Sequence, residues 1–476
     1  MNKRLRLTLV SLVVALGACA APPPPPVATP ASVTAPAVEP PPFAATTAAP
    51  TREATANDQR ALRLSIFDAA WKTVRDKHYD RTLGGLDWNA VRARYEPLAL
   101  AAPSEAAFYR VLNQMIGELG QSHMMITGPG ADDDDDAEEL TAPGETASSG
   151  PTAPSSGAIG DPGLTVRVIE GRPTITAVRA RSAAERAGLQ PGYIVTHIAG
   201  RELKVTTDSA RPMRPVEERF AVRRLALRRL LGVAGTRVSV RFLDNADRPG
   251  QVVLVRDEPT ARPVHVGHLP PLYPEVHARQ QGDVGIIAFN IFLLDPVLGQ
   301  IQRAIDGFRT RGVHALILDL RGNPGGHGAM AIPVASRLVD APLTLGTIQF
   351  RDFTQTLVAR PEMGVTPFLG PVAILTDEGT ASASEILAAG LQEAKRAVVV
   401  GDSTLGAALP SLIEALPGGA VMQYVVADFR TPKGVLLEGR GVQPDKRVLE
   451  TRAGLRTGRD PVLDAALVAI RASRPR

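Results

Sequence analysis

The chain has 476 residues, more than one ordinary domain and enough for two or three. Its only cysteine cannot support a disulfide framework or a thiolate metal site. The net charge of +4 comes from 53 basic and 49 acidic residues without nucleic-acid-binding motifs, so nucleic acid is not expected as a partner.

The first 19 residues have the layout of a secretory signal peptide. Basic residues precede an apolar run at 7–16, which is shorter than the roughly 20 residues of a membrane span. A transmembrane helix is the alternative. The letters LGAC at 16–19 resemble the lipobox of bacterial lipoproteins, which implies lipidation of Cys19. Because Ala20 follows in place of aspartate, the resemblance implies an outer-membrane anchor facing the periplasm of the cell envelope.

Three segments of different composition come next. Residues 20–57 are rich in proline and alanine and predict an extended tether. Residues 58–130 carry apolar side chains near helical spacing and predict a helical cap domain. Residues 131–162 begin with an acidic run and continue with Ser, Gly and Pro, which predicts a disordered insert. The run lacks the alternating ligands and turn glycine of a calcium loop, the alternative reading.

Residues 163–260 predict a β-rich domain. Expected strands and an arginine-rich helix, in chain order, are strands 164–168 and 174–178, helix 222–231, and strands 237–243 and 251–256. The letters AGLQPGYI at 187–194 resemble the signature of PDZ domains, with Tyr193 in place of the usual aspartate. The resemblance implies that a polypeptide C-terminus binds as an added strand beside Leu164, Thr165, Val166, Arg167 and Val168. A PDZ-like fold with a purely structural role is the alternative.

Residues 261–476 alternate between expected strands and helices, which predicts an α/β core. The expected elements are strand 284–289, helix 297–309, strand 315–320 and strand 372–376. The last strand leads into TASASEI at 380–386, a tight turn that opens a helix. A serine there would lie beside unpaired N–H groups that favour an oxyanion, although Ser382 or Ser384 could simply cap the helix.

Four motifs occur in a specific order: DLRGNPGG at 319–326, TASASEI at 380–386, GDSTLG at 401–406 and EGRGVQPD at 438–445. Together with the PDZ-like segment they resemble the C-terminal processing (tail-specific) serine peptidases over about residues 100–450. The implied fold is a crotonase-like α/β serine peptidase core with an N-terminal helical cap and an inserted PDZ-like β-rich domain. The resemblance assigns the nucleophile to Ser382, with Ser384 as the weaker candidate.

One position departs from the family pattern. The processing branch has a basic lysine 25 residues after the serine, and Ala407 stands there. The branch that resembles the tricorn core protease uses a Ser-His-Ser-Glu tetrad instead, which implies roles for Ser122, His123 and Glu438 beside the nucleophile. Histidine titrates near neutral pH and can activate a serine, with the glutamate orienting it directly or through Ser122.

Other readings of the polar residues stay open. His123 could be a structural histidine, Lys395 and Lys433 are other conceivable bases, and His327 is a candidate for lining the cleft only. Two glycines after a strand can turn their N–H groups toward a ligand. The oxyanion hole is therefore assigned to the N–H of Ala383 together with the N–H of either Gly325 or Gly326. We find no metal-ligand spacing or dinucleotide motif and expect no metal or cofactor.

The sequence therefore predicts a lipoprotein serine endopeptidase that binds polypeptide substrates at their C-terminal ends and cleaves through an acyl-enzyme intermediate. The alternative is a catalytically silent protein that binds apolar ligands or peptides at the cell envelope, as the similarity of this core to interphotoreceptor retinoid-binding proteins allows. A third possibility is a PDZ scaffold held at the membrane.

Overall fold

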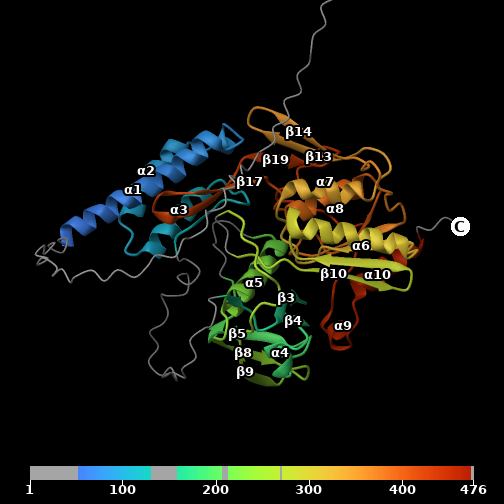
Figure 1. Cartoon of the computed structure of the whole chain (residues 1–476). Helices are drawn as coiled ribbons and strands as arrows, with labels where there is room; N and C mark the ends of the chain where they lie inside the picture. Colours follow the sequence, from blue (N-terminus) through green and yellow to red (C-terminus); the bar gives the residue numbers. More distant parts are fainter. Residues whose placement is uncertain (1–51, 130–157, 206–212, 268–270, 473–476) are drawn as a thin grey trace, which may run out of the picture. The chain divides into compact units, whose positions relative to one another are not determined.

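The structure is a computed structural model that describes residues 52–129, 158–205, 213–267 and 271–472 (Figure 1). The predicted lipidation site Cys19, residues 20–51 of the tether and most of the acidic insert lie outside these residues. Residues 52–57, also predicted as tether, are helical, so the first helix begins before the predicted boundary at residue 58. Among the described helices, none is both long and apolar enough to cross a membrane.

Three helices form the N-terminal part: α1 (Arg52–Lys77), α2 (Trp88–Leu100) and α3 (Glu105–Gly117). Side chains cap the last two, because the Asp87 carboxylate accepts N–H groups at the start of α2 and the Ser104 hydroxyl accepts the Ala107 N–H at the start of α3. The helices share a buried apolar cluster with a three-stranded sheet. Its strands, in spatial order, are β1 (Met125–Thr127), β18 (Val421–Val425) and β17 (Ser411–Ala415). The loop between α3 and β1 is therefore fixed at both ends.

A second sheet makes up the middle of the chain. Its strands in spatial order are β3 (Leu164–Ile169), β4 (Arg172–Val178), β5 (Ile194–Ile198), β8 (Arg237–Leu243) and β9 (Pro249–Val255), with β6 (Arg201–Glu202) paired to β5. The helices are α4 (Ala183–Arg186) and α5 (Pro215–Leu230), and a two-stranded pair joins β2 (Ile159–Gly160) to β7 (Gly232–Val233). β3 is an edge strand, and α5 packs against it (Figure 1).

Helix α5 begins well before the predicted residue 222. Pro215 occupies the first turn, where its fixed φ suits a helix and its missing N–H costs nothing. Glu217 and Glu218 follow in the same turn, where carboxylates favour the positive end of the helix. The prediction missed this start because it relied on the run of arginines and did not use the proline and glutamates of the first turn.

The C-terminal part is built on a six-stranded sheet. Its order is β10 (Val276–Gln281), β11 (Val284–Phe289), β12 (Ala315–Asp319), β15 (Val372–Thr376), β16 (Val398–Gly401) and β20 (Lys446–Arg447). All neighbours are parallel except the antiparallel edge strand β10. A smaller antiparallel sheet has the order β14 (Thr354–Ala359), β13 (Leu343–Phe350) and β19 (Ala427–Arg430).

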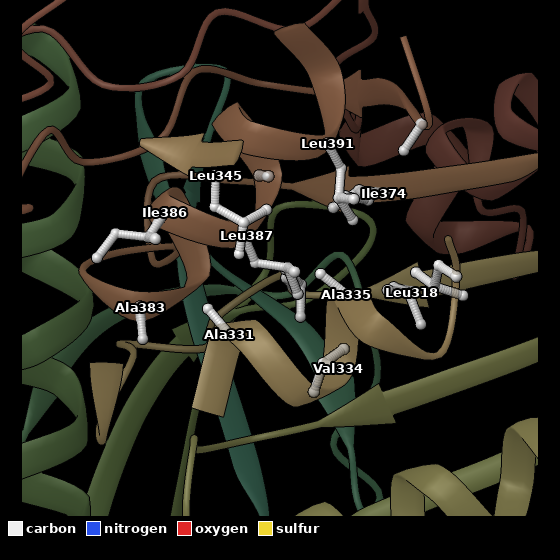
Figure 2. Close-up of a cluster of buried hydrophobic side chains, with 14 of the residues drawn as sticks. Leu318, Ala331, Val334, Ala335, Leu345, Ile374, Ala383, Ile386, Leu387 and Leu391 are labelled. Carbon is white, nitrogen blue, oxygen red and sulfur yellow. The ribbon is translucent and has the colours of Figure 1, made fainter. Parts of the chain in front are cut away.

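Helices cover both faces of the large sheet, because its strands alternate buried apolar side chains between the two. One face, with Leu318 and Ile374, packs under α6 (Gly299–Thr310), α7 (Ala331–Ser336) and α8 (Ala383–Glu393). The other face packs against α10 (Pro461–Ala472), which follows the short helix α9 (Arg452–Arg456). Figure 2 shows the α7 and α8 side chains of the first cluster, including Ala383 at the start of α8.

The predicted α/β core with a helical N-terminal region is confirmed. The inserted β-rich sheet also lies where the sequence places it, and its PDZ character stays a prediction.

Candidate active site

Ser382 lies at the junction of β15 and α8 in a backbone conformation that is unusual for serine. Its φ of 54° and ψ of −122° fall outside the common regions for L-residues. The Ser382 N–H donates to Ala407 O at 2.9 Å and to Glu385 Oε2 at 3.0 Å. The side chain is partly buried, and the turn places it at the N-terminal, positive end of α8.

Glu385 holds this turn against the segment that follows β16. The carboxylate is fully buried and also accepts from three groups of that segment: Thr404 Oγ1 at 2.5 Å, Gly406 N–H at 2.8 Å and Ala407 N–H at 3.0 Å. Burial raises the pKa of Glu385 to about 7, and the hydrogen bonds oppose that rise. The sequence reasoning did not single out Glu385, although a glutamate three residues after a helix-capping serine is the capping-box signal.

Ser384 occupies a different environment. It is fully buried, and its hydroxyl donates to Asn323 O at 3.1 Å, a backbone carbonyl that also accepts the Ala381 N–H. The hydroxyl of Ser384 thus fixes the serine turn to the segment after β12. Only Ser382 of the two serines is accessible for attack on a substrate.

The glycine pair after β12 lies against the serine turn. A Cβ added to Gly325 would lie 2.6 Å from Ser382 Cβ and 2.9 Å from Ala383 N, so only glycine allows this approach. The Gly325 N–H is already donated to the side chain of buried Asn323 at 2.9 Å. In contrast, the N–H groups of Gly326 and Ala383 have no hydrogen-bond acceptor among the described residues.

Ser122, His123 and Glu438 form a hydrogen-bonded relay. Ser122 Oγ lies 2.8 Å from His123 Nδ1 and donates to Glu438 Oε2 at 2.9 Å, while the Ser122 N–H donates to Glu438 Oε1 at 2.8 Å. Because the Ser122 proton is given to the carboxylate, the hydroxyl oxygen accepts from the Nδ1–H of the histidine. His123 Nε2 then carries a free lone pair and can act as a base.

Burial shapes the charge of both ends of the relay. It lowers the pKa of His123 to about 4, so the imidazole is neutral at pH 7. Burial also raises the pKa of Glu438, and the hydrogen bonds from Ser122 and Ala408 N–H oppose this rise. Among the described residues, no hydrogen bond joins His123 to the Ser382 hydroxyl, so the structure brings the two to one region without pairing them.

The segment at the missing lysine connects the two halves of the site. The N–H groups of Gly406 and Ala407 donate to Glu385, and that of Ala408 donates to Glu438 Oε2 at 3.2 Å. Ala407 O accepts the Ser382 N–H. Ala407 therefore positions the site through its backbone, whatever side chain stands there.

The other candidate bases lie elsewhere. Helix α8 has 11 residues and spans about 16 Å, and exposed Lys395 lies beyond its C-terminal end, opposite Ser382. Exposed Lys433 is at the same end, because its N–H donates to Glu393. His327, predicted only to line the cleft, directly follows Gly326 and is exposed, and its N–H donates to Phe292 O. Neither lysine is within reach of Ser382.

A pocket of about 350 Å³ adjoins the relay. It lies where the loop between α3 and β1, called the cap loop below, meets the inserted domain and the core. Ser122, Glu438 and Ala407 contribute to its wall, and Arg214 from the start of α5 donates to Leu405 O at 2.8 Å. Phe220 of α5 also lines it and packs against Ala381, Leu405 and Ala407. Helix α5 therefore forms one wall of the site.

The predicted peptide-binding strand, residues 164–168, coincides with edge strand β3. Leu164 and Val166 are buried in the core of the inserted domain, with Thr165 exposed and Val168 half-buried. The Arg167 guanidinium is engaged, because it pairs with Glu378 at 2.8 Å and Glu450 at 2.6 Å. Among the described residues, β3 pairs with β4 alone, so no strand occupies its other backbone edge.

Comparison with known proteins gives two matching family descriptions, Peptidase family S41 over residues 283–448 and the Tricorn protease C1 domain over residues 59–117. The probable CtpA-like serine protease of Staphylococcus saprophyticus is 25% identical over 276 residues, which is 58% of this chain and 50% of that protein. The carboxyl-terminal-processing protease of Synechocystis sp. is 26% identical over 381 residues, 80% of this chain and 79% of that protein.

Among solved structures, the photosystem II D1 C-terminal processing protease has a similar fold. The TM-score is 0.53 at 22% sequence identity, and the match covers 82% of this chain and 93% of the other. The chain spans about half the length of the first two known relatives that it matches in sequence.

Proposed function

Because the chain belongs to peptidase family S41, the C-terminal processing peptidases, we propose that it is a serine endopeptidase that cleaves polypeptides. The observation that carries the proposal is the relay from Glu438 through Ser122 to His123, which joins residues 316 positions apart in the sequence. A relay that occupies Nδ1 leaves Nε2 of a neutral imidazole as the base that a serine nucleophile needs.

In the proposed reaction, His123 Nε2 takes the proton of the Ser382 hydroxyl while Ser382 Oγ bonds to the carbonyl carbon of the substrate. The histidine then gives the proton to the leaving amine as the C–N bond breaks, and an acyl-enzyme remains. Water, activated by the same nitrogen, releases the acid. Glu438 stabilises the imidazolium through Ser122. The transfer requires the hydroxyl and Nε2 to approach to about 2.6–3.2 Å when substrate binds.

We assign the oxyanion hole to the N–H groups of Ala383 and Gly326. Both lack an acceptor among the described residues, whereas the N–H of Gly325 is already donated to Asn323. An N–H that is free and held at a helix start can stabilise the developing negative charge without reorganising. Gly325 would then allow the segment after β12 to lie close to the serine turn, because it has no Cβ.

The edge strand β3 supports a role in holding substrate ends. A polypeptide C-terminus would pair with its open backbone edge, as the PDZ resemblance implies, and α5 would flank it. Since α5 also lines the pocket beside the relay, bound substrate would enter close to Ser122 and Glu438.

Location is proposed from the sequence alone. If Cys19 is lipidated, the protein is anchored at the outer membrane and faces the periplasm. The Cys19→Ser variant should then leave the membrane fraction or fail to mature. Unchanged membrane fractionation of that variant would contradict the anchor.

A fluorophosphonate probe tests the peptidase proposal without knowledge of the substrate, because it modifies activated serines. The folded wild-type protein should be labelled, and Ser382→Ala should not. His123→Ala should lose nearly all labelling, and Glu438→Gln should retain more because it only disorients the base. Lys395→Ala and Lys433→Ala, which change the other candidate bases at the far end of α8, are controls that should still be labelled. A double Ser382→Ala, His123→Ala variant should cleave no worse than either single variant.

A folded wild-type protein that the probe does not label would contradict the proposal. That result, together with binding of apolar ligands or peptides without turnover, would favour the catalytically silent alternative. Full labelling of His123→Ala would rule out the tetrad and leave the identity of the base open.

A further inference from the structure

A buried histidine that the proposed mechanism does not use contacts the cap loop that carries Ser122 and His123. His78 follows α1 and is only 1% exposed. Its Nε2 lies 2.7 Å from Oε1 of Gln121, the residue before Ser122, and its Nδ1 lies 3.1 Å from the backbone N and O of Asp80. A buried imidazole of this kind keeps both nitrogens hydrogen-bonded, which fixes the ring and its partner.

The hydrogen bonds determine what the Gln121 amide offers. With Nδ1 accepting the Asp80 N–H, Nε2 carries the proton and donates to Gln121 Oε1. The oxygen end of the amide is thereby engaged. The NH₂ end has no acceptor among the described residues, although Gln121 is partly buried.

Gln121 also lines the pocket beside the relay, together with Ser122 and Glu438. The other charged residues of the pocket are Arg214, Glu217 and Glu438. Arg214 pairs with Glu217 at 2.9 Å, so the carboxylate of Glu438 gives the pocket a net negative charge. A carboxylate ligand is disfavoured in this field, whereas a neutral carbonyl oxygen is a suitable acceptor for the amide.

We propose that Gln121 is a substrate-binding residue, whose NH₂ group donates to a backbone carbonyl oxygen of the polypeptide in this pocket, and that His78 is a positioning residue that holds the amide. The inference rests on the proposed peptidase function. It explains why a polar, buried histidine stands in the otherwise apolar interior of the cap.

Gln121→Glu is the first test, because it keeps the shape and the oxygen that accepts from His78, while it replaces the NH₂ donor with a carboxylate oxygen and adds a negative charge. With a peptide substrate that the wild type cleaves, KM should rise about tenfold and kcat should change less than about twofold, as expected for a hydrogen bond made equally before and during the reaction. The rate of fluorophosphonate labelling of Ser382 should not change. Gln121→Leu controls for the added charge, because it removes the same donor without a carboxylate and should raise KM in the same direction.

His78 is tested through its partner. His78→Phe should raise KM in the same direction, and adding it to Gln121→Leu should raise KM no further than Gln121→Leu alone, because the histidine acts through the amide. Thermal unfolding of each variant separates this effect from lost stability. An unchanged KM in Gln121→Glu, or labelling that falls together with cleavage, would overturn the proposal. A wild type without labelling would instead overturn the peptidase function itself.

Discussion

Ser382 holds a backbone conformation that costs about 1–3 kcal/mol for a residue other than glycine. Glu385 offsets that cost, since its buried carboxylate binds both the Ser382 N–H and the segment around Ala407. The strain is thus maintained by hydrogen bonds that converge from two segments. Such strain is common where a functional group must stand clear of its own helix.

The acid limb of the pH–rate profile should report His123. Burial lowers the pKa of His123 to about 4, so the base stays deprotonated as pH falls through the usual histidine range near 6.5. We expect kcat/KM to stay level from pH 8 to about 5 and to fall below that. A decline centred near 6.5 would mean that the imidazole is solvated in the free enzyme.

Glu438 should contribute to the same limb, because burial raises its pKa and its protonation weakens the relay. Because Ser122 links the two groups, they titrate as a pair. The fall of kcat/KM with decreasing pH should therefore be steeper than the fall that protonation of a single group produces. In Glu438→Gln the limb should flatten to a single proton. The measurement is kcat/KM from pH 4 to 8 for both proteins, with circular dichroism to exclude unfolding.

At the scale of elements, β3 and α5 join the inserted domain to the serine turn after β15 through buried charges. Arg167 of β3 and Arg223 of α5 pair with Asp377 and Glu378, which follow β15. Burial disfavours the charged form of Asp377, but the two arginines and the N–H groups of Gly322 and Gly379 hold its pKa well below the usual value. The charges are therefore structural partners and depend on one another.

Arg167→Met should reveal this dependence. The Glu378 side chain is 1% exposed, so removing its closer partner leaves a buried carboxylate with only the 3.6 Å contact to Arg223 and should destabilise the fold by about 3–5 kcal/mol. Arg179→Met is the control, because the Arg179 and Asp161 side chains are 38% and 32% exposed and their pair should be worth about 1 kcal/mol or less. Urea unfolding measures both, and equal losses would contradict a special role for the buried pair.

Sequence patterns predicted those helices and strands that a short run of neighbouring residues specifies. The predicted strands 284–289 and 372–376 coincide with β11 and β15, because continuous apolar runs are typical of buried parallel strands. The motif order also pointed to Ser122, His123 and Glu438, which the structure brings into contact. Patterns could not reveal the His78–Gln121 pair or the Arg167 network. Each joins residues far apart in sequence, and nothing in a local run indicates which distant charge or amide will face it.

At the scale of the whole described chain from residue 53 onward, the site is assembled from three parts. The cap loop supplies Ser122 and His123, the core supplies Ser382 and Glu438, and the inserted domain supplies α5 with Arg214. Glu438 joins the core to the loop between α3 and β1 by accepting the hydroxyl and the N–H of Ser122, and Arg214 and the Arg167 and Arg223 ion pairs join the inserted domain to the core. Geometry at the serine therefore depends on how all three pack, which also makes the inserted domain part of the site's wall.

The proposed capture of substrate ends by β3 gives a prediction about the substrate. Two peptides of identical sequence, one ending in a free carboxylate and the other amidated, should be cleaved with the same kcat, while amidation should raise KM about tenfold. A carboxylate accepts charge-assisted hydrogen bonds from backbone N–H groups, which are worth about 1.5–3 kcal/mol, and the amide loses much of this. Steady-state kinetics of the wild-type enzyme on the pair measure the effect without altering the protein, so the buried charges that join the inserted domain to the core stay intact. Equal KM values would mean that the open edge of β3 does not select polypeptide ends and that the inserted domain acts only as a wall of the site.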